Sequence, residues 1–153
     1  MYSATILLSG LVVLLVLLLI HQRGLMEKQF RKELSRQIFL EASAAKRLMQ
    51  SYSEKDPKKR LEILLSAAEI RPECHGVYNA IGYAYLDMGK TSEALAAFGR
   101  AVQYHPSDSA SLADLAYGHL LSENRNLARR YFEEAVSLSA AIAEEPRFAE
   151  LRD

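Results

Sequence analysis

The chain of 153 residues has a single cysteine, Cys74, and no tryptophan. One cysteine excludes an internal disulfide and any zinc site built on paired cysteines. His75 follows Cys74 directly, and adjacent residues do not share a helix face. His105 and His119 complete no ligand spacing with this pair. We therefore expect no metal site and no cofactor.

The sequence also lacks the short motifs that accompany catalysis. It has no glycine-rich phosphate loop, no Gly-x-Ser-x-Gly elbow and no His-Glu-x-x-His pair. Its paired glutamates, at 133–134 and 144–145, are typical of solvated helix faces rather than of acid–base pairs. We predict that the chain is not an enzyme and takes no small-molecule substrate.

An excess of charge of one sign is missing as well. Lys and Arg number 19, and Asp and Glu number 19, which gives a formal net charge of zero. This balance excludes the basic footprint of a nucleic-acid-binding domain. Half of the residues are hydrophobic, so the chain as a whole is not disordered. Length and composition favour one folded domain with an attached anchor.

Proline is scarce, and its positions are informative. No Gly- or Pro-rich linker divides the chain, and each proline falls near an expected helix boundary: Pro57, Pro72, Pro106 and Pro146. Asp56 is a candidate N-cap for a helix that starts with Pro57 and runs to Ile70. The sequence therefore predicts an all-α protein.

One long hydrophobic run is present. Residues 4–20 read ATILLSGLVVLLVLLLI without a charge, which approaches the ~20 residues that span a bilayer. A cleaved signal peptide is the main alternative, but no Lys or Arg precedes the run and no cleavage site is evident. A buried core helix fits a small domain less well, because the run is apolar on all sides. We predict an uncleaved transmembrane anchor at residues 1–22.

A basic stretch at residues 23–40 follows this run, with Arg23, Lys28, Arg31, Lys32 and Arg36. Basic residues stay on the cytoplasmic side, so the N-terminus is expected outside and the C-terminal domain in the cytoplasm. Residues 25–52 lack Pro and Gly and are predicted to form one long helix. Two roles for these charges remain: they contact anionic lipid headgroups, or they only set the topology and keep the helix that follows the membrane in water.

Residues 75–108 carry a spaced pattern of small and large side chains. The first half has an aromatic residue, Leu or Ile, Gly and Tyr in order: Tyr78, Ile81, Gly82 and Tyr85. The second half has Ala, Phe, Ala and Pro in order: Ala94, Phe98, Ala101 and Pro106. Small residues are expected where two helices cross closely, and large ones where the neighbouring space is filled. The pattern and its period of 34 residues resemble the tetratricopeptide repeat. That resemblance implies a short α-solenoid of antiparallel helix pairs.

Further copies flank this repeat at the same period. Residues 109–142 match it through Leu112, Leu115, Ala116, Ala128, Phe132 and Ala135. Residues 41–74 form a degenerate copy, in which Leu48 stands for Gly82 and Arg60 for Ala94. A long arginine does not fit a close crossing, so Arg60 should point outward or the helices should lie further apart.

The helices expected after residue 75 span 76–88, 91–104, 109–121 and 125–143, with Thr91 as the cap of the second. Residues 143–153 are predicted to form a capping turn in which Phe148 and Leu151 fold back onto the last repeat.

The resemblance also implies a concave groove lined by the first helix of each repeat. The positions expected to bind a partner there are Met49, Tyr52, Asn79, Tyr83, Leu86, Ala113, Tyr117, Leu120 and Leu121. Most are apolar or aromatic, so a clamp for a C-terminal carboxylate is not expected. The alternative to partner binding is that the N-terminal helix covers some of these residues.

These observations predict a membrane-anchored adaptor or scaffold that holds a protein partner. The rival interpretation is a structural subunit, packed permanently in a membrane complex or on itself.

Overall fold

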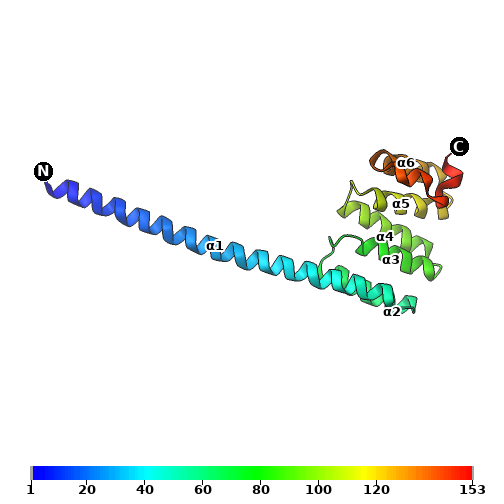
Figure 1. Ribbon diagram of the computed structural model, residues 1–153, viewed down its shortest axis with the longest axis horizontal. Helices are drawn as coiled ribbons and strands as arrows, with labels where there is room; N and C mark the ends of the chain where they lie inside the picture. Colours follow the sequence, from blue (N-terminus) through cyan, green and yellow to red (C-terminus); the bar gives the residue numbers. More distant parts are fainter. Residues whose placement is uncertain (1, 153) are drawn as a thin grey trace. The chain divides into compact units, whose positions relative to one another are not determined.

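The computed structural model describes residues 2–152, with side chains from residue 14 onward. Every regular element in this range is helical (Figure 1). Six α-helices are followed by two 3₁₀ turns: α1 (Tyr2–Ser53), α2 (Pro57–Ile70), α3 (Val77–Asp87), α4 (Thr91–Tyr104), α5 (Ser109–Leu121), α6 (Arg125–Leu138), η1 (Ala140–Glu144) and η2 (Pro146–Leu151). The chain divides into two compact units, Met1–Phe39 and Leu40–Asp153.

The first unit is the N-terminal part of α1. Its described apolar side chains are exposed, among them Phe30, Leu34 and Ile38. Residues 4–13 of the predicted anchor lie outside the part of the chain whose side chains are described. No helix within the described residues is long and apolar enough to cross a membrane.

The second unit is a stack of helix pairs. The end of α1 packs on α2, where Arg47 donates a hydrogen bond of 2.8 Å to Ser66 and Glu41 pairs with Arg71. The hairpins α3–α4 and α5–α6 follow, and contacts of α2 with α3 and of α4 with α5 join successive pairs (Figure 1). This arrangement is the solenoid that the repeat pattern predicted.

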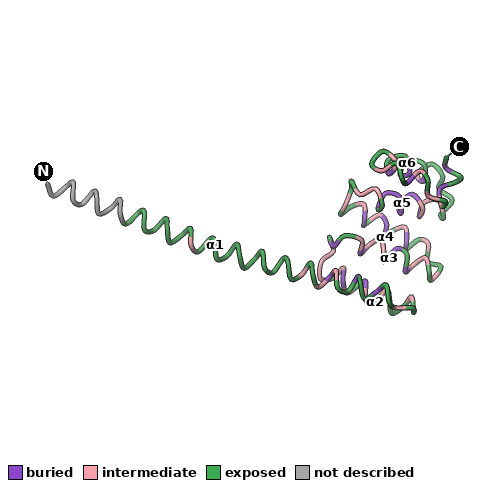
Figure 2. The backbone as a smooth tube through the Cα atoms, in the orientation of Figure 1, coloured by how far each residue is buried: buried purple, intermediate pink, exposed green. Residues whose placement is uncertain are grey.

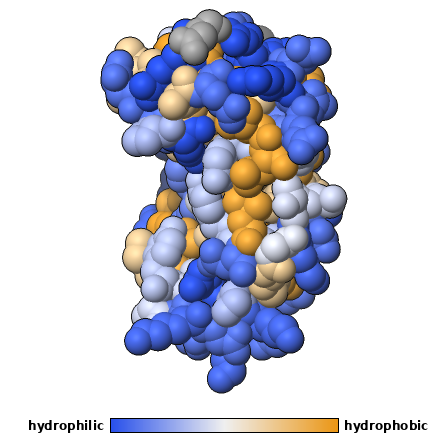
Figure 3. All heavy atoms as spheres, turned by 90° about the vertical axis from the view of Figure 1, so that its right-hand side faces the viewer, coloured by the Kyte–Doolittle hydropathy of each residue, from blue (hydrophilic) through white to orange (hydrophobic). Residues whose placement is uncertain are grey.

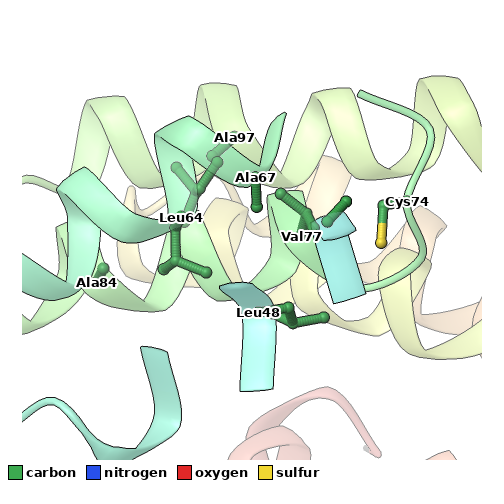
Figure 4. Close-up of a cluster of buried hydrophobic side chains, with 9 residues drawn as sticks. Leu48, Leu64, Ala67, Cys74, Val77, Ala84 and Ala97 are labelled. Carbon is green, nitrogen blue, oxygen red and sulfur yellow. The ribbon is translucent and has the colours of Figure 1, made fainter. Parts of the chain in front are cut away.

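Figure 2 shows that buried residues occur in each helix of this stack, whereas the described part of α1 before it is almost entirely exposed. Figure 4 shows the first of three clusters, in which Leu48 of α1, Leu64 of α2 and Val77 of α3 lie together. Seen from one side, hydrophobic residues form a strip between hydrophilic margins (Figure 3). The core therefore runs continuously from the end of α1 to η2 through all three clusters.

The small residues of the repeat pattern lie at the helix crossings. A Cβ atom on Gly82 would stand 2.2 Å from the Phe98 ring, so α3 and α4 approach closely there. The five alanines of the pattern are at most 2% exposed: Ala94, Ala101, Ala116, Ala128 and Ala135. The Arg60 side chain is 27% exposed and pairs with Asp87 of α3 at 2.5 Å.

Most predicted helix ends agree with the structure to within one residue, and two features differ. Asp56 caps α2 as predicted, since its side chain accepts a hydrogen bond from the Lys58 amide at 3.0 Å. The prediction of Thr91 as a cap is wrong, because Lys90 is the N-cap of α4 and Thr91 is its first helical residue.

The predicted helix 125–143 is also wrong at its end, because α6 stops at Leu138 and Ser139 is extended. The turn brings Ile142 into the core, where it is 8% exposed, so burial outweighs the helical preference of the segment. Phe148 and Leu151 then fold back onto α6, as predicted. The rings of Phe148 and Phe132 are 5.0 Å apart.

Candidate protein-binding groove

An open groove of about 720 Å³ runs along the first helices of the repeats. The end of α1, α3 and α5 each contribute residues to it, and helical periodicity turns the same face of each helix inward. Its lining comprises Leu48, Met49, Ser51, Tyr52, Arg60, His75, Gly76, Asn79, Ala80, Tyr83, Asp108, Ala110 and Asp114. The end of α1 forms a wall of this groove and does not cover it.

Four of the expected partner-binding residues line this groove: Met49, Tyr52, Asn79 and Tyr83. Met49 and Tyr52 are 67% and 66% exposed, although both are large and apolar. Tyr83 is partly exposed, and its ring meets Phe98 edge-on at 5.3 Å. These side chains offer a mobile thioether and two aromatic faces to a partner.

The other five lie outside the groove lining. Ala113 is fully buried between α5 and its neighbours, so it has no free surface. Leu86, Tyr117 and Leu120 are half-buried and pack against the core clusters. Leu121 is exposed at the end of α5 but does not line the groove. The predicted partner-binding positions therefore line the groove in the first two repeats only.

The groove ends at a buried carboxylate that sequence reasoning missed, Asp114 of α5. Its Oδ2 accepts a hydrogen bond from Asn79 at 2.7 Å, and its Oδ1 accepts one from the Tyr83 hydroxyl at 2.6 Å. Arg147 of η2 donates a further hydrogen bond to Oδ1 at 2.7 Å. The Ser111 hydroxyl donates to Asp108 at 2.6 Å and lies 3.2 Å from the Asn79 Oδ1. Asp114 is thus held by three donors from two elements, α3 and η2.

Arg147 closes this end of the groove. Its guanidinium carbon lies 5.5 Å from the centre of the Tyr117 ring and 4.9 Å from that of Phe148. The same guanidinium donates to the Tyr83 hydroxyl at 2.6 Å and to Glu145 at 2.6 Å. Tyr117 therefore faces Arg147 of its own chain, which explains why it does not line the open groove with Met49, Tyr52 and Tyr83.

A sequence signal for Asp114 did exist. It is the only acidic residue of α5, SASLADLAYGHLL, in a helix that is otherwise small and apolar. A charge on such a helix has to be paired when it is buried, which points to a cationic partner. The partner itself was not predictable, because its position depends on where α6 ends.

Three titratable groups around the groove have shifted pKa values. Burial, followed by the hydrogen bond to Asp114, raises the pKa of the Tyr83 phenol well above its ordinary range. Burial would lower the pKa of Arg147, but its bonds to Asp114 outweigh burial and raise it. Burial alone would raise the pKa of Asp108, yet hydrogen bonds from Ser111 and the nearby His75 hold it below its usual value. These shifts move each group away from neutral pH, which suits binding rather than proton transfer.

No group of three or more His, Cys, Asp or Glu side chains is arranged to hold a metal ion in the described part of the chain. Asp108 and His75 do approach each other, at 3.5 Å, at the groove margin.

The comparisons with known proteins bear on this geometry. Residues 75–108 match the tetratricopeptide repeat. The match covers α3, α4 and the turn before them. "Protein SGT1 homolog" of Bos taurus is 29% identical over 106 residues, which are 67% of this chain and 31% of that protein. The chain thus spans about a third of this curated relative.

Two solved structures share the fold. They are titled "Crystal structure of MamA" and "Crystal structure of MamA protein", with TM-scores of 0.59 and 0.57 and identities of 17% and 16%. Each covers 69% of this chain, and this chain covers 63% and 60% of theirs. Together with the repeat match, they support an α-helical repeat fold that contains a tetratricopeptide repeat at residues 75–108.

Proposed function

We propose that the chain is an adaptor that binds a segment of a partner protein in the groove between the end of α1, α3 and α5. The observation that carries this proposal is the exposure of Met49 and Tyr52 on the groove wall. Large apolar side chains concentrated on a concave surface mark an interaction site, whereas isolated ones do not.

The contact is expected to be mainly apolar and aromatic. Truncating one such anchor costs about 2 kcal/mol or more when it lies at the centre of an interface. The charges at the margin already have partners within the chain: Arg60 pairs with Asp87, and Asp108 accepts hydrogen bonds from the amide and the hydroxyl of Ser111. Partner binding should therefore depend weakly on salt, unlike binding through a basic clamp.

The experiment is quantitative capture of the partner by the full chain from its native membrane extract. The test variant carries Met49→Ser and Tyr52→Ser, and the control carries Leu65→Ser and Leu138→Ser. The control residues are also apolar and exposed, at 42% and 51%, but lie on α2 and α6 outside the groove. The proposal predicts loss of the partner with the test variant alone. Equal recovery with both variants, or equal loss, would reject the groove as the binding site.

We further propose that residues 4–20 anchor the adaptor in a membrane as a single span, with the C-terminal domain in the cytoplasm. The uncharged run and the basic residues after it support this assignment. The protein should resist alkaline extraction and keep a mass that includes residues 1–20. External protease should spare the domain in sealed vesicles of native orientation. A mature N-terminus beyond residue 17, or digestion of the domain, would overturn it.

The rival function is that of a structural subunit in a permanent assembly. The observation in its favour is the exposed row of Phe30, Leu34 and Ile38, which recur at i+4 on α1. The mass of the purified chain in detergent separates the two: an adaptor is a stable monomer, and a self-assembling subunit is not.

A further inference from the structure

The closed end of the groove already holds a group that resembles a ligand, the guanidinium of Arg147. It reaches Asp114 and Tyr83 of the groove lining from η2, at 2.7 Å and 2.6 Å. These two residues and Asn79 also line the open part of the groove. The guanidinium site is therefore continuous with the surface proposed for the partner.

The geometry of this site selects a guanidinium. Asp114 supplies the negative charge, and Asn79 and Tyr83 orient its two oxygens. The ring of Tyr117 lies 5.5 Å from the guanidinium carbon. A planar cation with several N–H donors can bond the carboxylate and lie over a ring at once, which an ammonium group cannot do equally well.

Arg147 can leave this site without dismantling the end of the fold. The C-terminal segment is anchored by Phe148 and Leu151, which are 0% and 2% exposed. The Arg147 side chain keeps 23% of its surface accessible. The segment is thus anchored by burial of Phe148 and Leu151 in the core, although the Phe148 ring also contacts the guanidinium at 4.9 Å.

We propose that Asp114, Tyr83, Asn79 and Tyr117 form an arginine-binding site, which Arg147 fills in the free protein and an arginine of the bound partner segment takes over. This inference rests on the proposed function, because the partner is delivered by the groove. The departing Arg147 gives up its hydrogen bond to Glu145 and moves into solvent, so no buried cation is left behind. The buried carboxylate is paired in both states, which makes the exchange feasible.

The test uses the full chain in detergent and blocked tripeptides, acetyl-Gly-Arg-Gly-amide against its lysine and citrulline counterparts. Citrulline keeps the shape of arginine without the charge. Binding is followed by NMR at the side-chain amide of Asn79, which contacts Asp114 directly. With Arg147→Ala the arginine peptide should bind about tenfold or more tightly than the citrulline peptide. It should bind more weakly to the wild-type chain, where Arg147 competes.

Adding Asp114→Asn to Arg147→Ala should remove the preference for arginine. If Arg147→Ala does not fold, the same titration of the wild-type chain decides, read at the Arg147 Nε–H resonance. That resonance should move toward its solvent-exposed position as the peptide displaces Arg147. A folded Arg147→Ala chain without arginine preference, or an unmoved resonance at saturating peptide, would overturn the proposal. Because no partner protein is used, such a failure leaves the groove test with Met49 and Tyr52 unaffected.

Discussion

The close crossing of α3 and α4 makes a sharp prediction for Gly82→Ala. The added Cβ would lie 2.2, 2.5 and 2.7 Å from three atoms of the Phe98 ring. Phe98 is fully buried, and its opposite edge would lie 3.0 Å from a Cβ on Gly118. The ring therefore has little room to retreat, and α3 and α4 must separate instead.

The expected magnitude combines two opposing effects. Overpacking a buried site costs about 1–3 kcal/mol, and the depth of this overlap places it toward the upper end. Alanine favours a helix interior over glycine by about 0.8–1.0 kcal/mol. The free energy of unfolding should therefore fall by about 1–2 kcal/mol in Gly82→Ala.

Gly99→Ala is the matched control. Gly99 lies inside α4, and nothing stands within 4 Å of a Cβ at this position. The same substitution should raise stability by about 0.5–1 kcal/mol, because only the helix preference acts. Urea unfolding of the two full-length variants, monitored by circular dichroism, measures the change in unfolding free energy of each. In a thermal melt of the same variants, a loss of 1 kcal/mol should lower the melting temperature by about 4 °C. A Gly82→Ala chain at least as stable as Gly99→Ala would refute the packing of this crossing.

Four further substitutions test other parts of the fold by the same unfolding assay. Ala101→Leu should cost about 1–3 kcal/mol by overpacking, whereas Lys90→Ala, which removes only an exposed pair, should change stability by less than about 0.5 kcal/mol; the reverse ranking would show that the helix register is wrong. Phe148→Ala should cost about 3–5 kcal/mol, since it empties a fully buried site against α6, and a cost near zero would mean that η2 does not cap the repeat. Burial lowers the pKa of His119, so the unfolded chain binds the proton more readily and stability should fall as the pH drops below about 6.5; His119→Gln should reduce that fall, and an unchanged pH profile would contradict the burial of this ring.

The repeat architecture was predictable because its determinants are local and periodic. Gly82 and Phe98 occupy fixed positions in the 34-residue repeat, and these positions meet where α3 and α4 cross. Their places in the sequence therefore suggest their packing. The cap at Asp56 was predictable for the same reason, since Asp followed by Pro is a helix-start signal. At Thr91 the preference of threonine for the N-cap position misleads by one residue, because the preceding Lys90 takes that position.

The closed end of the groove was not predictable, because it depends on tertiary packing. Residues 139–143 have a helical composition, but the burial of Ile142 ends α6 early and redirects the chain. Only that redirection brings Arg147 to Asp114, 33 residues away in sequence. Tyr117 has the same repeat position as Tyr83, and the period alone gives no sign that an arginine from the C-terminal segment covers it.

The central claim is that the partner lies in the groove between the end of α1, α3 and α5. The most direct measurement is site-specific photo-crosslinking of the full chain in the cells that produce it, with benzoylphenylalanine placed at Tyr52 or at Leu138. Both positions are exposed, but only Tyr52 lines the groove. The account predicts a discrete crosslinked partner from position 52 and none from position 138. A partner captured from position 138 and absent from position 52 would contradict it.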